Sequence, residues 1–385
     1  VDKGTQMEQG DGKDLQWEEA LALASSASVE ESATLDACVA DLGVCLTLGE
    51  DEEDEDPGLL KRRQRVRRLH HWHALSGSAG LLEKNPGAYA YLLRQVAVNP
   101  IEAKAIVRDA RCTYAVKHPI RITPVKLAGK TVALLGADGT PIKKWRHVDG
   151  GGEEKDSTPP QELLGPFASS LCNILSCFCA MFSVGMWGQA DAEAEVGGDG
   201  DADDPKLQSR YVSGLNYVAG YCLVTCRDEE AAYWLFVAIF KRVRGLFEPG
   251  MAGSNLIMEV LGRAIDENLP KLSGLLSDAH VDASFWMLGQ LQTLFARSTY
   301  PRNHTKACWD AFLVSNCALD VLVRIAIAVV ECLGPLLRAA KGQAAMIELL
   351  QKPPVDLLDG ETLLEKALTY KLSEKDAAVL FQLGD

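Results

Sequence analysis

An uncharged stretch in the middle of the sequence constrains the fold more than any other feature. The 28 residues from Leu163 to Ala190 include no Asp, Glu, Lys or Arg, and a helix of that length could cross a bilayer. Pro166, Asn173 and Gln189 interrupt its apolar character, together with several serines. We therefore interpret the stretch as a fully buried helix of a large helical protein, with a membrane span as the alternative.

Amphipathic helical patterns fill most of the chain after Arg210. Residues 228–243 begin with acids and end with bases, which complements the helix dipole at both ends. The apolar run 319–337 contains Arg324 and Glu331, which indicates a core helix and not a membrane span. Between 255 and 268, six apolar residues fall on one helical face: Leu256, Ile257, Val260, Leu261, Ala264 and Ile265. No strand-like alternation and no fixed repeat period appear, so the predicted fold class is all-α.

Shorter helices are expected between residue 59 and Pro119. Apolar spacing predicts two amphipathic helices, and Asn85-Pro86 is expected to cap the second and start its first turn. A third helix is expected to begin at Pro100 and to end before Pro119. The residues predicted to face the core in the first two are Leu69, Trp72, Leu75, Tyr89, Leu92, Leu93 and Val96.

Composition changes along the chain predict its organisation. Turn-rich alternation followed by a glycine-rich linker suggests an inserted β-hairpin, and a second, acidic and glycine-rich insertion is expected to be disordered. The expected parts are an acidic irregular segment 1–58, a first helical part 59–119, an insertion 120–162, the remaining helical domain 163–340 with a disordered insertion near 188–208, and a helical extension 341–385.

Charge narrows the classes of partner. With 53 acidic and 39 basic residues, the net charge of −14 argues against a nucleic-acid-binding protein. Seven consecutive acids, Glu50–Asp56, precede six basic residues within Lys61–Arg68. We interpret this switch as a solvated linker followed by a helix, with a basic arm for phosphate or lipid headgroups as the alternative.

Cysteine usage and motifs exclude several kinds of site. The 11 cysteines are odd in number and scattered, which favours a reducing, cytoplasmic compartment over a disulfide scaffold. The "HHWH" run at 70–73 lacks the i, i+4 pairing of a helical metal site. Phosphate-loop, dinucleotide, GxSxG and HExxH patterns are missing, so neither a metal nor a cofactor is expected. Cys112 and His118 are close only in sequence, which does not establish a thiol nucleophile.

Seven short segments, in chain order, carry a resemblance to a known family. They are "RRLHHWHALSG" with "NPGAYAYLL", "IVRDARCTYAVKHP", "LCNILSCFCAMF", "YVSGLNYVAGYCL", "DEEAAYWLFVAIF", "LQTLFAR" and "ACWDAFLVSNCALDVLVRIAIAVV". In this order they resemble the blocks of the TBC domain, the helical domain of Rab GTPase-activating proteins. The resemblance runs from about Leu59 to Leu337, interrupted by the two insertions.

The resemblance implies a fold and a partner. It implies a two-lobed multi-helical domain that acts on a Rab-type small GTPase, with GTP and magnesium carried by that partner. It also implies a role in membrane traffic, with peripheral membrane association through the GTPase.

The family supplies two side chains to its partner, an arginine that neutralises charge on the transferring phosphoryl group and a glutamine that positions water. Carried over onto this sequence, the arginine position is Cys112 and the glutamine position is Ser213. Cysteine has no guanidinium, and serine is too short to replace a glutamine carboxamide. Arg111 is adjacent but rotated by about 100° on a helix, and Arg108 lies one turn earlier on the same face.

Other positions of the family's site are present. Asp109 matches the carboxylate that orients the arginine in the family, and we expect it to pair with Arg108 or Arg111. Tyr211, Gly214 and Asn216 are expected to keep the geometry of the loop and, with Arg108, to contact the partner.

Three hypotheses follow. The preferred one is a TBC-fold protein that lacks the two-finger chemistry and acts by binding a Rab-type GTPase or an assembly, as a pseudoenzyme. The second is an active GTPase activator with Arg111 as a substitute finger and the GTPase's own glutamine in use. The third is a structural subunit of a larger complex.

Overall fold

The computed structural model describes residues 57–95, 100–114, 165–183, 211–297, 302–354 and 359–384. Within these ranges every regular element is helical, which confirms the all-α prediction. Both predicted insertions, with the expected β-hairpin and acidic loop, lie outside the described residues, as does nearly all of the N-terminal segment.

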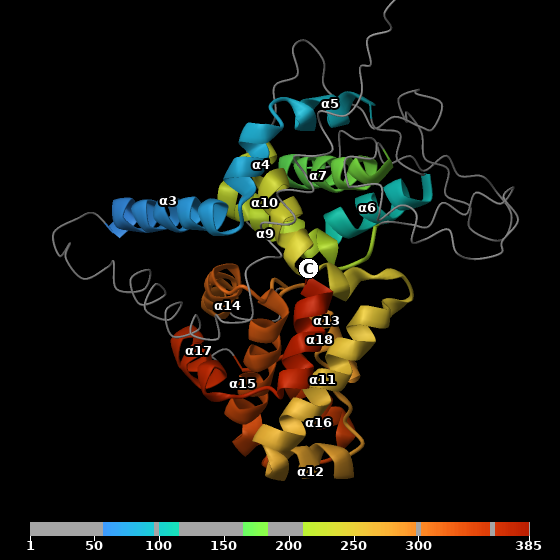
Figure 1. The fold of residues 1–385 in the computed structure, drawn as a ribbon, viewed down its shortest axis with the longest axis vertical. Helices are drawn as coiled ribbons and strands as arrows, with labels where there is room; N and C mark the ends of the chain where they lie inside the picture. The colour runs from blue at the N-terminus through green and yellow to red at the C-terminus, as the bar shows by residue number, and fades with distance from the viewer. Residues whose placement is uncertain are drawn as a thin grey trace, which may run out of the picture. The chain divides into compact units, whose positions relative to one another are not determined.

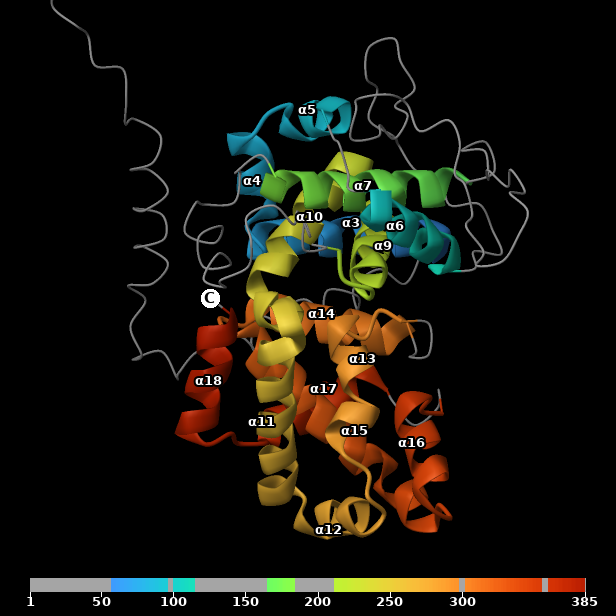
Figure 2. The ribbon, with the colours of Figure 1, turned by 90° about the vertical axis from the view of Figure 1, so that its right-hand side faces the viewer.

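Contacts divide the described helices into two groups, which occupy the upper and lower parts of the ribbon in Figures 1 and 2. In the first group, α7 packs on α5, α6, α9 and α10, and α4 joins α3 to α10. Its members are α3 (Pro57–Leu75), α4 (Ser78–Lys84), α5 (Ala88–Gln95), α6 (Pro100–Cys112), α7 (Pro166–Ser183), α9 (Leu215–Cys226) and α10 (Glu229–Arg242).

The second group surrounds α15, which packs on α11, α12, α14, α16, α17 and α18. Its longer helices are α11 (Ala252–Asn268), α12 (Pro270–Asp278), α14 (Arg302–Val314), α15 (Ala318–Ala339), α16 (Gln343–Gln351), α17 (Gly360–Thr369) and α18 (Glu374–Gly384). Short elements complete it: η2 (Arg244–Phe247), η3 (Pro249–Met251), η4 (Ala283–Phe285) and α13 (Leu288–Gln292).

The uncharged stretch forms α7, and its apolar residues are buried. Leu171, Ile174, Leu175 and Phe178 have no measurable exposure, because helices of the first group cover the faces on which they lie. Among the described helices, none has the length and apolar character needed to cross a bilayer. The interpretation of α7 as a buried core helix is therefore confirmed for its described residues.

The two expectations for Asn85-Pro86, as the cap and the first turn of the following helix, were wrong. Asn85 does not cap the following helix but ends α4, where its Nδ2 donates to the carbonyl of Leu81 at 2.9 Å. The next helix, α5, begins at Ala88, after Gly87 with a φ of 76°. The third helix, α6, begins at Pro100 and ends at Cys112, which agrees with the expected start and with an end before Pro119.

Two leucines predicted to face the core are exposed. Leu75 is 40% exposed because α3 ends there and the chain turns through Gly77. Leu256 is 44% exposed, whereas its neighbour Ile257 is fully buried. One residue corresponds to a rotation of about 100° on a helix, so Leu256 falls at the edge of the apolar face.

A buried carboxylate joins the two groups through α3 and α14. Asp310 accepts a hydrogen bond of 2.6 Å from the indole Nε1 of Trp72 and one of 3.1 Å from Nε of Arg68. The rings of Trp72 and Trp309 lie 5.4 Å apart beside this contact. Burial raises the pKa of Asp310, while the charge of Arg68 opposes that shift. The contact links residues that are 238 positions apart in the sequence.

Arg242, the last residue of α10, makes a second connection between the groups. Its guanidinium donates to the carbonyls of Leu313 at 2.7 Å, Leu75 at 3.4 Å, and Ser315. These carbonyls lie at or just beyond the C-terminal ends of α3 and α14, where the helix dipole favours a positive charge. Burial lowers the pKa of Arg242 below its ordinary value.

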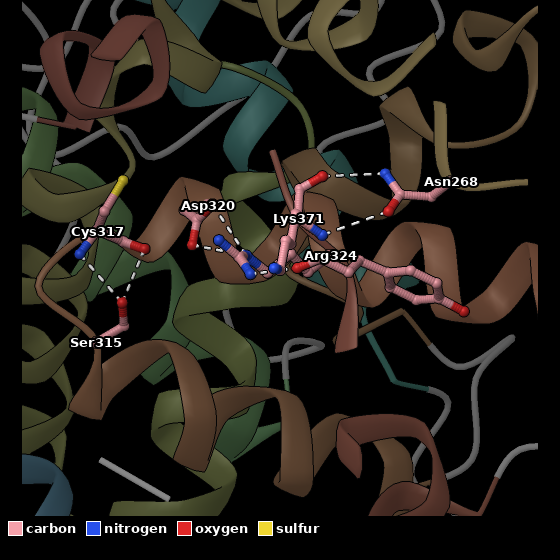
Figure 3. A network of polar contacts seen from close by, with 7 residues as sticks. Asn268, Ser315, Cys317, Asp320, Arg324 and Lys371 are labelled. Carbon is pink, nitrogen blue, oxygen red and sulfur yellow. Dashed lines mark hydrogen bonds and ion pairs between the residues drawn. The ribbon is translucent and has the colours of Figure 1, made fainter. Parts of the chain in front are cut away.

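A polar network fixes the connection between α17 and α18 (Figure 3). Asn268 at the end of α11 donates to the carbonyl of Lys371 at 3.1 Å and accepts from its backbone N–H at 3.3 Å. Arg324 on α15 contacts Asp320, with Nε 2.9 Å from Oδ2, and donates to the carbonyl of Tyr370. Asn268 and Arg324 thus hold one short segment from two sides.

His304 in α14 makes the stability of the fold depend on pH. It is fully buried, and burial lowers its pKa to about 3. In the unfolded chain a histidine has a pKa of about 6.5, so below that pH the unfolded state binds a proton that the folded state does not. We expect the free energy of unfolding to fall, through this group, by up to about 1.4 kcal/mol per pH unit between about pH 6 and pH 3.

The measurement is urea denaturation of wild type and His304→Gln from pH 7.5 to pH 4. Asp310 and Glu229 act in the opposite direction, because burial raises the pKa of each carboxyl and protonation therefore favours the folded state. Both groups are present in both proteins, so the difference between the two curves isolates His304. The variant should be less stable near neutrality and should lose less stability on acidification. Parallel curves would contradict the assignment.

Candidate functional site

The end of α6 is tied to the loop 211–214 and the start of α9 by hydrogen bonds between buried polar groups. Asn216, buried in the first turn of α9, donates from Nδ2 to Oγ1 of Thr113 at 2.6 Å. Thr113 in turn donates from Oγ1 to the carbonyl of Asp109 at 2.7 Å. Because each group satisfies another, the two segments hold one fixed relative position.

The loop keeps its shape through Gly214 and Asn216. Gly214 has a φ of 116°, which L residues rarely adopt, and a Cβ at this position would lie 3.3 Å from the carbonyl oxygen of Gln292. Its backbone N–H donates to Oδ1 of Asn216 at 2.9 Å. The Gly214 and Asn216 positions therefore have the structural role that the sequence predicted for them.

Cys112 and Ser213 are both exposed on the surface beside these contacts. Cys112 is the last residue of α6 and carries a free thiol. Ser213 lies in the turn before α9. The sequence predicted that these two positions form one site, and the structure places them on adjacent segments joined by hydrogen bonds.

Asp109 is the centre of the polar contacts on this surface. Its Oδ2 accepts from the hydroxyl of Tyr211 at 2.9 Å, and its Oδ1 accepts from Nε of Arg108 at 2.9 Å. The Asp109 side chain is 12% exposed, whereas that of Arg108 is 71% exposed. Burial, followed by the charge of Asp109, raises the pKa of Tyr211, and the charge of Arg108 opposes this shift. Tyr211 and Arg108 thus lie on the same side of α6.

Arg111 lies elsewhere on α6. Burial raises the pKa of Cys172 to about 12, and the charge of Arg111 acts to lower it. Cys172 belongs to α7, which packs against α6. Of the two arginines that the sequence offered as partners for Asp109, the structure pairs Arg108 with it.

Two further residues, which the sequence did not assign to the site, also hold the end of α6 and the loop 211–214 in place. Glu102, buried in the first turn of α6, accepts from the backbone N–H of Tyr211 at 3.2 Å. Tyr114 donates from its hydroxyl to the carbonyl of Ala296 at 2.6 Å and so joins the end of α6 to the segment after α13. Tyr114 could have been assigned to the site from the sequence, since it follows Thr113 in a segment that resembles a family block. No feature of the sequence indicated this role for Glu102.

The exposed side chains at the end of α6 and in the loop 211–214 include two arginines and two short neutral residues. Arg108 and Arg111 offer positive charge, while Cys112 and Ser213 offer a thiol and a hydroxyl. No group of three His, Cys, Asp or Glu that could hold a metal occurs in the described ranges, and the "HHWH" histidines are among the residues searched.

A comparison with protein families matches residues 202–337 to the family described as the Rab-GTPase-TBC domain. The matched range contains Ser213, Gly214 and Asn216, and ends with α15; Cys112 and Arg108 precede it.

Two solved structures have a similar fold. The chain aligns with a crystal structure of the Chlamydomonas flagellar RabGAP TBC domain at a TM-score of 0.54 and 18% identity, covering 88% of this chain and 94% of that one. It aligns with the Ypt/Rab-GAP domain of Gyp1p at a TM-score of 0.54 and 14% identity, covering 79% and 88%. At these identities the likeness concerns the fold, which is that of a TBC Rab-GAP domain.

Curated relatives match shorter parts of the chain. TBC1 domain family member 2A of Bos taurus is 32% identical over 121 residues, which is 31% of this chain and 13% of that protein. Growth hormone-regulated TBC protein 1 of Xenopus laevis is 38% identical over 71 residues, 18% of this chain and 20% of that protein. The matched part thus spans a fifth or less of each of these relatives.

Proposed function

We propose that this chain, which has the TBC Rab-GAP fold and matches the Rab-GTPase-TBC domain over residues 202–337, binds a GTP-loaded Rab-type GTPase. We further propose that it is catalytically impaired as an activator of that GTPase. The observation that carries the proposal is that Cys112 and Ser213 are both exposed, on two segments that the Asp109–Tyr211 and Thr113–Asn216 hydrogen bonds join. The joined segments support binding, and the two side chains lack the groups that accelerate hydrolysis.

The chain would act as a regulator or scaffold in membrane traffic, in the cytoplasm and peripherally on membranes that carry the GTPase. The GTP and the magnesium ion would belong to the partner. The alternative of full activity through Arg111 has less support, because the described contacts pair Arg108 with Asp109, the carboxylate that would orient an arginine. A structural role in an assembly has no specific observation in its favour.

The proposal is tested by binding to a panel of Rab-type GTPases. Each is immobilised in complex with either GDP or a nonhydrolysable GTP analogue, and the affinity of the purified chain is measured. We expect at least one to bind preferentially in the GTP form. Asn216→Ala removes the contacts with Gly214 and Thr113, and it should weaken that binding about tenfold, equivalent to about 1.4 kcal/mol.

Asn268→Ala is the matched control. Asn268 also joins two segments through its side-chain amide, but at the α17–α18 connection (Figure 3) and not on α6 or α9. Asn268→Ala should lower the free energy of unfolding but should not change the affinity for the GTPase by more than about twofold. The proposal is wrong if no GTPase of the panel prefers the GTP form, or if both variants weaken binding equally.

A further inference from the structure

We infer that Arg108 supplies the positive charge that meets the γ-phosphate of the GTP held by the partner, and that the partner's own glutamine must position the attacking water. The inference rests on the proposed function and specifies how the site distinguishes the GTP form of the partner from the GDP form. It also restricts the partners on which any activation could occur to GTPases that retain that glutamine.

Arg108 is held in place yet presents its charge outward. Nε donates to Asp109 at 2.9 Å, and Asp109 is fixed by the Tyr211 hydroxyl at the start of the loop that carries Ser213. Within the described part of the chain, the terminal nitrogens Nη1 and Nη2 of Arg108 donate to no acceptor. A planar guanidinium with two such nitrogens is suited to bidentate contact with phosphate oxygens.

The position of Arg108 on α6 fits this role. It precedes Cys112 by four residues, which places the two on the same face of the helix about 6 Å apart along its axis. Arg108 and Tyr211 contact the same carboxylate, that of Asp109, so the Arg108 side chain lies on the side of α6 that faces the loop. Among the described contacts, Arg111 does not pair with Asp109. Arg108 is therefore the arginine on the side of the loop.

The water must be positioned by another protein. In GTP hydrolysis a water oxygen bonds to the γ-phosphorus as the bond to the β–γ bridging oxygen breaks. GDP leaves with that electron pair, and the protons of the water pass to phosphate and solvent. Arg108 can neutralise charge in this step but cannot orient the water, and Ser213 has no carboxamide for that purpose. A GTPase that uses its own glutamine supplies the missing group.

The first experiment measures affinity for a GTPase that bound in the panel, loaded with GDP or with the GTP analogue. Arg108→Ala should weaken binding of the GTP-analogue form about tenfold and leave the GDP form within about twofold. Arg108→Lys keeps the charge but loses the planar fork, so its affinity for the GTP-analogue form should lie between those of wild type and Arg108→Ala. Arg94→Ala on α5 removes another exposed positive charge and should change neither. A loss with Arg111→Ala and not with Arg108→Ala overturns the assignment.

The second experiment tests the origin of the glutamine. Cys112→Arg restores an arginine while keeping Ser213, and its stimulation of hydrolysis should disappear when the partner's catalytic glutamine is replaced by leucine. Addition of Ser213→Gln should restore stimulation of that altered partner. Persistent stimulation by Cys112→Arg alone would show that this chain positions water by itself, against the inference.

Failure of the inference is distinguishable from failure of the proposed function. If no GTPase binds in its GTP form, the proposed function is wrong. If binding occurs and depends on Asn216 but not on Arg108, the proposed function stands and the inference about Arg108 is wrong.

Discussion

Replacing Cys112 with Arg and Ser213 with Gln in the same chain is expected to raise the stimulated rate of GTP hydrolysis by about 10³-fold over wild type. An arginine supplied in trans is worth about 10³ to 10⁵ in rate, and the lower value applies because this frame has not been matched to the new side chains. The Asp109, Thr113 and Asn216 contacts that would orient both groups are present. Single-turnover phosphate release with a GTPase that binds the wild type is the measurement.

The matched control for this gain is Cys112→Lys with Ser213→Gln. Lysine restores the charge but not the planar fork of a guanidinium, so this variant should gain far less. Unchanged hydrolysis by the arginine variant, with binding intact, would mean that the two positions do not face the nucleotide. Equal and rapid hydrolysis by wild type and variant would mean that the wild type is not impaired.

Gly253→Ala is expected to lower the free energy of unfolding by about 3 kcal/mol. A Cβ at this position, in the first turn of α11, would lie 2.2 Å from the carbonyl oxygen of Gly245 and 2.8 Å from Oε2 of Glu248. The Glu248 side chain can move, but the Gly245 carbonyl belongs to η2 and can move only with the backbone. Overpacking of this kind costs about 1–3 kcal/mol, and a contact with backbone lies at the upper end.

Gly262→Ala, in the same helix, is expected to raise the free energy of unfolding instead. Nothing lies within 4 Å of a Cβ at Gly262, so the substitution should stabilise the chain by about 0.5–1 kcal/mol through helix propensity. Urea denaturation followed by circular dichroism compares the two. A loss of similar size in both variants would show that helix α11 tolerates neither, and that the close approach at Gly253 is not the cause.

The helices could be predicted from the sequence, because a helix that buries one face has apolar residues at a spacing of three to four positions. The helix α10 was predicted from its charged ends, and it has Asp228 as its N-cap and Lys241 and Arg242 in its last turn. Boundaries set by a single side chain were less accessible. An asparagine such as Asn85 is typical of both helix starts and helix ends. Only its hydrogen bond to the carbonyl of Leu81 shows that it ends α4.

The candidate site could be located from the sequence only through a family resemblance. No periodic signal relates Cys112, the last residue of α6, to Ser213 in the turn before α9, and the two lie 101 positions apart. The choice between Arg108 and Arg111 depended on which of them pairs with Asp109, a contact that only the structure shows. Helical geometry gives the angle between two residues, but not which side of the helix a partner will cover.

The contact between Trp72 and Asp310 has a consequence for how the chain folds during synthesis. The 238 positions between them mean that α3 emerges from the ribosome long before α14, the helix that satisfies its indole N–H and the charge of Arg68. At about 5–20 residues per second, that interval lasts roughly 10–50 s. During that interval the indole N–H of Trp72 and the charge of Arg68 lack the carboxylate that they contact in the folded chain, so this connection between the two groups of helices can form only late in synthesis.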